Sequence, residues 1–470
     1  MEEIKPERLP DKSNFIEWYN AVLQLAEIVD RRYPVKGSFV WLPYGFQIMK
    51  NLKEIWDKVF KENGIEEVYF PLFVPLEFAK INEEWFEGFK DEAFYVEGEN
   101  AILRPTGEPA MYPIFKFWIM EGKLPIKIYQ TVSSFRKEGK TTHTMIRDRE
   151  ITFWHEIHTV HKTREEAYEE MEKHRRIYEY IWKEVLNVPP IYVEKPKYEI
   201  FPGAESAYEF YTVLPNGRLL ENGSVNNLGQ AYAKKFDLFY VNEKGEKEYV
   251  WQVCTGNGAR FLVAAFTLHS DERGLILPPK IAPIQVVIIT IPKEGKDFVR
   301  EAKDLEENLN KKGIKALFDK SDKTPGEKFN VWDIRGVPVR IEIGELEIRE
   351  GFYTVYRRDL KKREKVKKDD LIEFLKKIIN EEIPKSLYKK VEKYYENVIK
   401  YFEDLEKAKG WIKEGKVVKV NWCGGKKCFD EITLLETSVE PIGFLPEKKN
   451  GKCIVCKKET ENLTLIGKTY

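Results

Sequence analysis

The residues most able to carry chemistry lie together between Phe135 and His161. This stretch brings three arginines beside three carboxylates: Arg136, Arg147, Arg149, Glu138, Glu150 and Glu156. An arginine can hold a phosphate through two parallel hydrogen bonds, and a nearby carboxylate can orient an amine or the edge of a base. Because 33% of the chain is charged, a solvated charged hairpin without a ligand is the alternative at this point.

Four of the six histidines lie in the same stretch: His143, His155, His158 and His161. Such a cluster can indicate a metal site. On a β-strand, however, residues three positions apart point to opposite faces, which separates His158 from both His155 and His161. The spacing therefore argues against a metal ion shared by these histidines.

Two strand-like runs position these side chains. Residues 126–132 lead into the charged stretch and residues 151–154 follow it, with a turn rich in Gly, Lys and Thr between them. This pattern predicts two antiparallel strands joined by a long loop. Arginines on such strands could bind a polyphosphate.

A hydroxyl and a carboxylate mark a second candidate site. Residues 100–112 predict a strand, a tight turn that contains Thr106 and Glu108, and a helix from about Ala110. Pro109 suits the first position of a helix, where an amide hydrogen is not needed. The two side chains could cap this helix or receive the ammonium group of a ligand, and both interpretations stay open here.

A third candidate site combines a glycine-rich turn with the start of a helix. A predicted strand from Trp251 runs into Cys254-Thr-Gly256-Asn-Gly, and a helix is predicted over 261–269 with Arg260 at its start. The N-terminus of a helix together with an arginine can bind phosphate. A single Gly-x-Gly is more often only a structural turn.

The rest of the chain reads as alternating helices and strands. Residues 66–75 are predicted as a buried strand that prolines interrupt, and residues 191–251 as a series of strands. From residue 281 the alternation of strands and helices predicts a small α/β domain with a mainly parallel sheet. Helical periodicity predicts helices over 14–32, 44–63, 162–186, 296–312, 369–383 and 386–409.

Size and composition place the chain among large soluble proteins. A length of 470 residues is enough for two to four domains, and 78 basic residues balance 78 acidic ones. A balanced charge does not exclude nucleic acid, because a local basic face suffices for binding. No apolar run is long enough to cross a membrane, and the polar N-terminus is not typical of a signal peptide. We expect a cytoplasmic protein that does not contact a membrane.

Four of the five cysteines lie near the C-terminus, in two close pairs. The pairs are Cys423-x4-Cys428 and Cys453-x2-Cys456. In a cytoplasmic chain this clustering favours a metal over disulfides. Four thiolates suit a closed tetrahedral Zn²⁺ site.

These features together resemble a known family, the prolyl-tRNA synthetases of the archaeal and eukaryotic type, within the class II aminoacyl-tRNA synthetases. The resemblance covers nearly the whole chain. It rests on phrases that include YPVKG at 33–37, WLPYG at 41–45, LRPT at 103–106, LPIKIYQ at 124–130, FPGAE at 201–205, NLGQ at 227–230, RGLILPP at 273–279, IAPIQVVI at 281–288 and GVPVRIEIG at 336–344.

The resemblance implies an α/β multidomain fold. Residues 1–278 would form the class II catalytic domain, an antiparallel sheet with helices, and residues 279–380 an α/β anticodon-binding domain. Residues 381–470 would form a small α+β domain that carries a structural Zn²⁺. The implied activity is the attachment of L-proline to tRNA(Pro) with ATP and Mg²⁺, by a homodimer.

The resemblance also implies roles for individual residues. The catalytic residues would be Arg136, Arg149, Glu150 and Arg260. ATP would contact Arg136, Glu138, Gln230 and Arg260. The amino acid would contact Thr106, Glu108, Arg136, Trp154, Glu156, His158, Cys254 and Gly256. The anticodon would contact Asp333, Arg340 and Glu347, and the metal would bind Cys423, Cys428, Cys453 and Cys456.

The chain departs from the family pattern at a few positions. It has Gly107 and Pro109 around Glu108, His143 in the hairpin loop, Asn226 before NLGQ, and Thr255 in the glycine turn. The segment after Gly344 also differs from the usual Pro-Lys-Asp. Two alternatives follow from these departures: a related synthetase with another amino acid or tRNA, or a tRNA-binding relative without catalytic activity.

Overall fold

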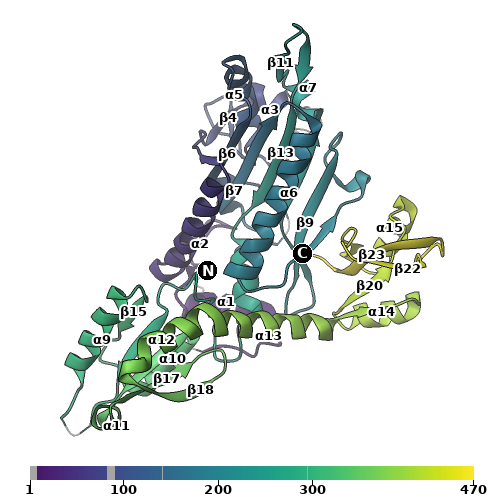
Figure 1. The fold of residues 1–470 in the computed structure, drawn as a ribbon. Helices are drawn as coiled ribbons and strands as arrows, with labels where there is room; N and C mark the ends of the chain where they lie inside the picture. Colours follow the sequence, from purple (N-terminus) through teal and green to yellow (C-terminus); the bar gives the residue numbers. More distant parts are fainter. Residues whose placement is uncertain (1–7, 82–89, 140, 294) are drawn as a thin grey trace.

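The computed structural model describes residues 8–81, 90–139, 141–293 and 295–470. Figure 1 shows a main lobe built on a large twisted sheet, a second lobe in green at its base, and a third lobe in yellow beside it. Helix α13 (Ile383–Val398) runs from the second lobe to the third. Among the described residues, no helix has the length and apolar character needed to cross a lipid bilayer.

The largest sheet of the described residues has seven strands in the order β3-β6-β7-β13-β10-β9-β8. Its hairpin pairs β6 (Ile126–Phe135) with β7 (Glu150–His161) in antiparallel register, which confirms the predicted hairpin. Neighbouring strands are antiparallel throughout, except that β3 runs parallel to β6. The remaining strands are β3 (Glu66–Glu67), β8 (Ile191–Glu194), β9 (Ser206–Val213), β10 (Leu219–Gly229) and β13 (Trp251–Asn257).

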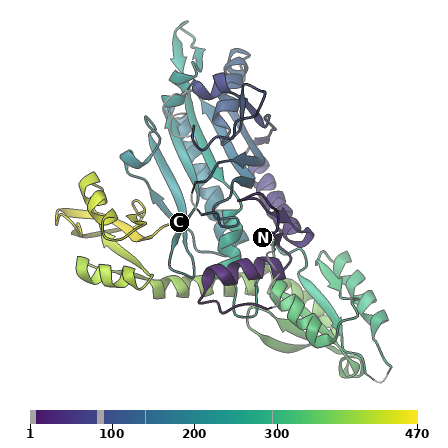
Figure 2. The same ribbon diagram turned by 180° about the vertical axis from the view of Figure 1, so that it is seen from behind.

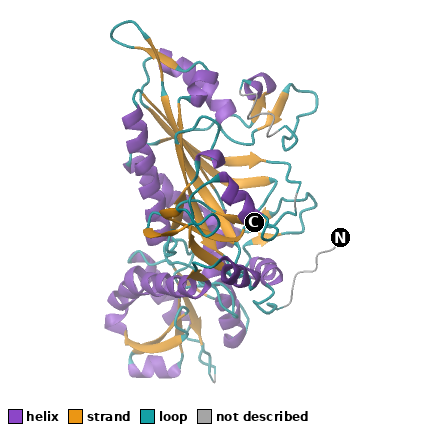
Figure 3. Ribbon diagram, turned by 90° about the vertical axis from the view of Figure 1, so that its right-hand side faces the viewer, coloured by secondary structure: helices purple, strands orange, loops and turns teal. Residues whose placement is uncertain are grey.

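Long helices cover one face of this sheet, as Figure 3 shows. α6 (Arg164–Tyr180) begins at a capping box in which Thr163 and Glu166 satisfy each other's backbone amides, and it continues into one π-helical turn (Ile181–Val185). Buried aromatic rings, among them Trp56, Trp182 and Phe261, fill the space between helices and sheet. The other helices of this core are α1 (Phe15–Leu25), seen across the base in Figure 2, α2 (Pro43–Glu62) and α8 (Arg260–Leu268).

The opposite face carries a second apolar core. Alternate side chains of β6 and β7, such as Ile128 and Val160, point into this core, while Tyr129 and Ile157 point into the first. The elements around it are α3 (Leu76–Lys80), α5 (Glu108–Met120), α7 (Ala231–Lys235) and the strand pair of β4 (Phe73–Pro75) and β5 (Ala101–Leu103). Two further strand pairs are β1 (Val29–Asp30) with β2 (Val40–Trp41), and β11 (Phe239–Val241) with β12 (Lys247–Tyr249). Tyr240 and Tyr249 of the second pair pack against this core.

The single buried strand expected over 66–75 is wrong. Residues 66–67 pair with β6 and are exposed, whereas residues 73–75 pair with β5 in a different sheet. Between them Pro71 lacks an amide hydrogen for a ladder. The Arg104 guanidinium binds the backbone there in place of a neighbouring strand. Its Nη1 donates to the carbonyl oxygens of Phe70 at 2.6 Å and Pro71 at 3.3 Å.

The second lobe contains a five-stranded sheet among the described residues, in the order β15-β14-β16-β17-β18. Only β15, β14 and β16 are parallel, so the expected mainly parallel sheet is half antiparallel. A parallel pair needs a long crossover, and the connections on either side of β17 are too short for one. The elements are β14 (Val286–Thr290), α9 (Val299–Lys311), β15 (Ala316–Phe318), α10 (Pro325–Arg335), β16 (Val339–Ile343), α11 (Glu345–Glu350), β17 (Phe352–Arg357), β18 (Lys362–Lys367) and α12 (Leu371–Lys377).

Helix α12 continues through a π-helical turn (Ile378–Glu382) into α13, so Pro384 does not end a helix as expected. Pro384 lies instead within this continuous helical segment, directly after the π-helical turn, as the second residue of α13. The helix expected over 386–409 is also interrupted, because residues 399–401 form β19 and pair with β20.

The third lobe is a small α+β unit. Its sheet has the order β19-β20-β23-β21, with β22 paired to β23. Its elements are β19 (Ile399–Tyr401), α14 (Leu405–Lys413), β20 (Val417–Asn421), α15 (Lys426–Thr433), β21 (Val439–Pro441), β22 (Lys448–Lys452) and β23 (Glu459–Lys468).

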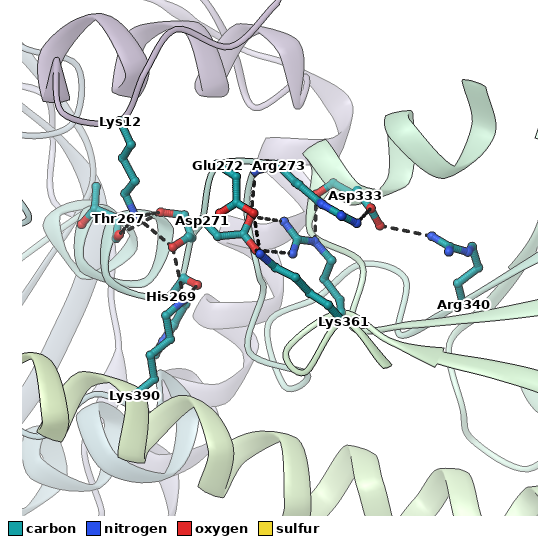
Figure 4. A network of polar contacts seen from close by, with 12 residues as sticks. Lys12, Thr267, His269, Asp271, Glu272, Arg273, Asp333, Arg340, Lys361 and Lys390 are labelled. Atoms are coloured by element: carbon teal, nitrogen blue, oxygen red, sulfur yellow. Dashed lines mark hydrogen bonds and ion pairs between the residues drawn. The ribbon is translucent and has the colours of Figure 1, made fainter. Parts of the chain in front are cut away.

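Charged side chains connect the lobes just beyond the end of α8 (Figure 4). Asp271 accepts two hydrogen bonds from Arg358 of the second lobe, at 2.6 and 2.7 Å. Lys12 donates to the carbonyl oxygens of Thr267 and Ser270, and Lys390 to those of His269 and Ser270. A Cβ on Gly274 would lie 2.4 Å from the Cα of Ile334, so this close junction requires glycine.

Candidate active site and metal centre

Two adjacent cavities lie on the sheet face that holds the second core. The first, here called the arginine cavity, is lined by Arg136, Glu138, Arg147 and Arg260 among others. The second, the carboxylate cavity, has a volume of about 370 Å³. Its lining includes Thr106, Glu108, Arg136, Trp154, Glu199, Glu209, Cys254 and Gly256.

Arg136 is common to both cavities and stands at the end of β6. Its Nε donates to the carbonyl oxygen of Pro105 at 3.3 Å, and its guanidinium carbon lies 5.4 Å from the centre of the Trp154 ring. A Cβ on Gly256 would lie 2.6 Å from that ring, so glycine is needed to seat the tryptophan. Burial, and after it the positive charge of Arg260, lowers the pKa of Arg136. Both effects disfavour the charged form of the guanidinium.

Arg260 begins α8 and points into the arginine cavity. Its Nε donates to the Ile146 carbonyl oxygen at 3.0 Å, and its Nη1 donates to the Glu221 carbonyl oxygen at 2.8 Å. Arg147 comes from the hairpin loop and pairs with Glu138 at 3.4 Å. Three arginines from separate segments therefore surround one space, an arrangement suited to a polyanion such as a polyphosphate.

Three other predicted residues lie beside the cavities rather than in their lining. Arg149 donates to the Glu138 carbonyl oxygen at 3.1 Å, and Glu150 accepts a hydrogen bond from Ser133 at 3.3 Å. Gln230 donates to the Tyr249 carbonyl oxygen at 2.7 Å. Their roles toward a nucleotide stay predictions.

A buried set of hydrogen bonds builds the floor of the carboxylate cavity. Glu156 on β7 accepts from the Gly107 amide at 2.9 Å, from Thr106 Oγ1 at 3.2 Å and from Trp154 Nε1 at 3.2 Å. Thr106 also donates to Glu108. Gly107 is the N-cap residue of α5. The Thr106 hydroxyl therefore interacts with the carboxylates of Glu108 and Glu156 and does not cap the helix.

Glu156 and His158 form a buried pair in this floor, and each shifts the pKa of the other. Burial alone would raise the pKa of Glu156, but hydrogen bonds from His158, Gln130 and the Gly107 amide outweigh it and hold the pKa at about 2. Burial acts to lower the pKa of His158, and the hydrogen bond to Glu156 reverses this, so that the pKa is raised. Tyr112 lies 3.2 Å from Nδ1 of His158 and orients the ring.

This floor has the chemistry of a cation site. Side-chain atoms of Glu108, Glu156 and His158 lie within 4.8 Å of one another and are buried. A protonated amine with two hydrogens can donate to the Glu108 carboxylate and the Thr106 hydroxyl while its charge is balanced. Burial raises the pKa of Cys254 at the wall, so that side chain is a neutral thiol.

The prediction missed several residues that line these cavities, carboxylates among them. Glu221 lines both cavities and pairs with Arg260 at 3.4 Å, and Asp148 lines the arginine cavity while accepting from the Met145 amide at 2.9 Å. Glu209 and residues 199–202 line the carboxylate cavity. In the sequence, only the FPGAE motif at 201–205 pointed to a functional role for that segment.

The predicted anticodon residues lie on the second lobe, where two of the three meet. Arg340 pairs with Asp333 at 3.2 Å, and its guanidinium is held between Phe329 at 3.9 Å and Tyr356 at 4.1 Å. Glu347 lies apart from them and accepts from the Gly344 amide and the Thr354 hydroxyl.

The four C-terminal cysteines converge in the third lobe. Sγ atoms lie 3.6 Å apart for Cys423 and Cys428, 3.9 Å for Cys453 and Cys428, and 3.7 Å for Cys456 and Cys423. A disulfide requires about 2.05 Å. Four sulfurs placed about 2.3 Å from a tetrahedral Zn²⁺ would be about 3.8 Å apart, so the residues fit this ion.

Comparison with known proteins agrees with this architecture. Residues 89–269 match the family of tRNA synthetase class II core domains (G, H, P, S and T), and residues 285–378 match an anticodon-binding domain. Residues 405–470 match the C-terminal domain of prolyl-tRNA synthetase.

Relatives match over the full length. The proline–tRNA ligase of Methanopyrus kandleri is 39% identical over 98% of this chain and 97% of its own length. That of Thermoplasma volcanium is 40% identical over 98% and 99%. A crystal structure of Cryptosporidium parvum prolyl-tRNA synthetase, complexed with halofuginone and AMPPNP, superposes with a TM-score of 0.92 at 29% identity, over 98% of this chain and 99% of that one.

The antiparallel sheet, the arginine-bearing hairpin and the following helix with Arg260 define a class II aminoacyl-tRNA synthetase. Within that class the full-length matches are specific. The chain belongs to the prolyl-tRNA synthetase family, as the sequence resemblance indicated.

Proposed function

We propose that this chain joins L-proline to tRNA(Pro) in two steps, activation by ATP and transfer to the ribose at the tRNA 3′ end. The observation that carries the proposal is the position of Arg136 between the arginine cavity and the carboxylate cavity. The reaction requires a carboxylate and an α-phosphate to meet between two binding sites. Arg136 stands where they would meet.

The arginine cavity would hold ATP with Mg²⁺. Arg136 would contact the α-phosphate and the proline carboxylate, Arg260 the γ-phosphate, and Glu138 the adenine. Activation is an attack of the carboxylate oxygen on the α-phosphate with release of pyrophosphate. It depends on alignment and on neutralised charge rather than on a protein nucleophile. Arg149, Glu150 and Gln230 would approach the phosphates, Mg²⁺ and the ribose once the nucleotide is bound.

The floor of the carboxylate cavity would hold proline. The ring nitrogen of proline carries two hydrogens and a positive charge, which Thr106 and Glu108 can accept. Glu156 and His158 would hold that turn in place from below. Trp154, Cys254 and Gly256 would enclose the apolar ring.

The second lobe would bind the anticodon through Asp333, Arg340 and Glu347. Because Asp333 and Arg340 already pair with each other, reading a guanine there would exchange this contact for hydrogen bonds to the base edge. We further propose the domain limits 1–278, 279–380 and 381–470, a structural Zn²⁺ on the four cysteines, a homodimer, and a cytoplasmic location.

The proposal is tested by charging of tRNA transcripts with radiolabelled amino acids. We expect proline to accumulate on tRNA(Pro), and a change of the anticodon guanines to lower kcat/KM for the tRNA. Charging of a different tRNA, or of tRNA(Pro) with another amino acid in preference to proline, would overturn it.

A further inference from the structure

Residues 195–202 lie between the third lobe and the carboxylate cavity. Their distal part lines the cavity with Glu199, Ile200, Phe201 and Pro202, and Thr106 and Glu108 line the same cavity. None of these four residues lines the arginine cavity, so this segment is a wall of the amino-acid end alone. On its inner side Phe201 packs against Tyr232 of the second core at 6.3 Å, and on its outer side the segment makes three contacts with the third lobe.

The first outer contact is a backbone pairing. Glu194 and Phe444 exchange two backbone hydrogen bonds of 2.8 Å each. The ring of Phe444 lies tilted against Trp422, with ring centres 5.2 Å apart, and packs so tightly on Gly424 that a Cβ there would lie 2.3 Å from it. Gly424 directly follows Cys423, so the Phe444 ring packs against the loop that contains this cysteine.

The second outer contact is the buried ammonium of Lys195. Its side chain is 8% exposed and lies 3.2 Å from Glu209 and 3.5 Å from Glu199. It also donates to the Ile442 carbonyl oxygen of the third lobe at 3.3 Å. One lysine therefore ties two carboxylates of the cavity lining to the third lobe.

The third outer contact is aromatic. Tyr198 meets Phe429 edge to face at 5.7 Å, and Lys426 lies 5.3 Å from the centre of the Tyr198 ring. Both partners are on α15, the helix that contains Cys428. Tyr198 itself lies one residue before Glu199 of the cavity lining.

We propose that the cysteine-bearing third lobe positions the wall of the amino-acid cavity, with Tyr198 and Lys195 as the positioning residues. The inference rests on the proposed function for the identity of the amino acid. Both residues act through residues 199–202 and do not themselves touch the substrate. Apparent affinity falls in proportion to the fraction of chains whose wall is in place.

The test compares the full-length protein with Tyr198→Ala, Tyr198→Phe and Lys195→Met in ATP–pyrophosphate exchange. We expect the KM for proline to rise about fivefold in Tyr198→Ala and Lys195→Met, while kcat and the KM for ATP stay near their original values. Tyr198→Phe keeps the edge contact and should restore the KM. Phe239→Ala is the matched control, since that ring also meets an aromatic partner, Tyr249, at 6.4 Å beneath a lysine but lies on the β11–β12 hairpin.

Backbone hydrogen exchange at residues 199–201 gives a second readout that does not depend on activity. Faster exchange in Tyr198→Ala and Lys195→Met, but not in the control, is expected. A KM for proline and an amide exchange rate equal to those of the unchanged protein would overturn the inference while leaving proline activation intact. If the unchanged protein activates no proline, the proposed function fails, and amide exchange alone then decides whether the lobe positions this wall.

Discussion

Glu156 and His158 form a buried pair beneath the turn at Thr106, with Oε2 and Nε2 3.4 Å apart and both side chains 1% exposed. The pair joins two segments that are distant in sequence, because Glu156 also accepts from the Gly107 amide. The position of the Thr106 and Glu108 side chains therefore depends on the buried charge of the Glu156 carboxylate.

Replacing Glu156 by Gln should weaken both the fold and amino-acid binding. We expect a loss of about 1–3 kcal/mol in the free energy of unfolding, because His158 loses its anionic partner. The KM for proline should rise, since the Thr106 turn is less well held. Denaturant unfolding and exchange kinetics measure these effects, and Glu169→Gln at an exposed position of α6 is the control. Equal effects of the two substitutions would contradict the role of the pair.

The same pair gives a defined dependence of stability on pH. The pKa of Glu156 is depressed to about 2 from 4.5, so its contribution is present above pH 4.5 and is lost as the pH falls toward 2. The pKa of His158 is raised from 6.5, so its contribution is complete below pH 6.5 and is lost as the pH rises through the folded value. The difference in unfolding free energy between the unchanged protein and Glu156→Gln should be largest between pH 4.5 and 6.5. A difference that does not vary with pH would show that the pair is not charged.

Removal of the Arg136 guanidinium should strongly slow activation without unfolding the protein. We expect Arg136→Ala to lower kcat for exchange by about 10²–10³-fold, the cost of losing one group that stabilises developing charge. Arg175→Ala is a matched control, because Arg175 pairs with Glu172 and Glu179 on α6 away from both cavities. Near-normal exchange by Arg136→Ala would refute its placement at the α-phosphate.

The C-terminal cysteines should bind one Zn²⁺ per chain. Cys453→Ser should lose the ion and several kcal/mol of third-lobe stability, whereas Cys254→Ser, which alters the cysteine outside the cluster, should retain the ion. Elemental analysis and thermal unfolding of both variants measure this. Full metal content in Cys453→Ser would exclude the four-cysteine site.

Much of this site could be predicted from local sequence, and the rest depends on tertiary packing. Arg136 and Glu156 lie on a hairpin whose strands follow from their own residue pattern. Glu221 was missed because its entry into both cavities depends on the irregular pairing of β9 and β10, where the register shifts between Glu221 and Gly223. Residues 66–75 were assigned wrongly because Arg104, about 30 positions later, determines where that backbone leaves the sheet.

The most direct test of the central claim is ATP–pyrophosphate exchange measured with each of the twenty amino acids. The placement of Arg136 between a polyphosphate cavity and an amine-binding floor predicts exchange that depends on proline, with the highest kcat/KM for that amino acid. Preference for any other amino acid, or no exchange with any of the twenty, would contradict it.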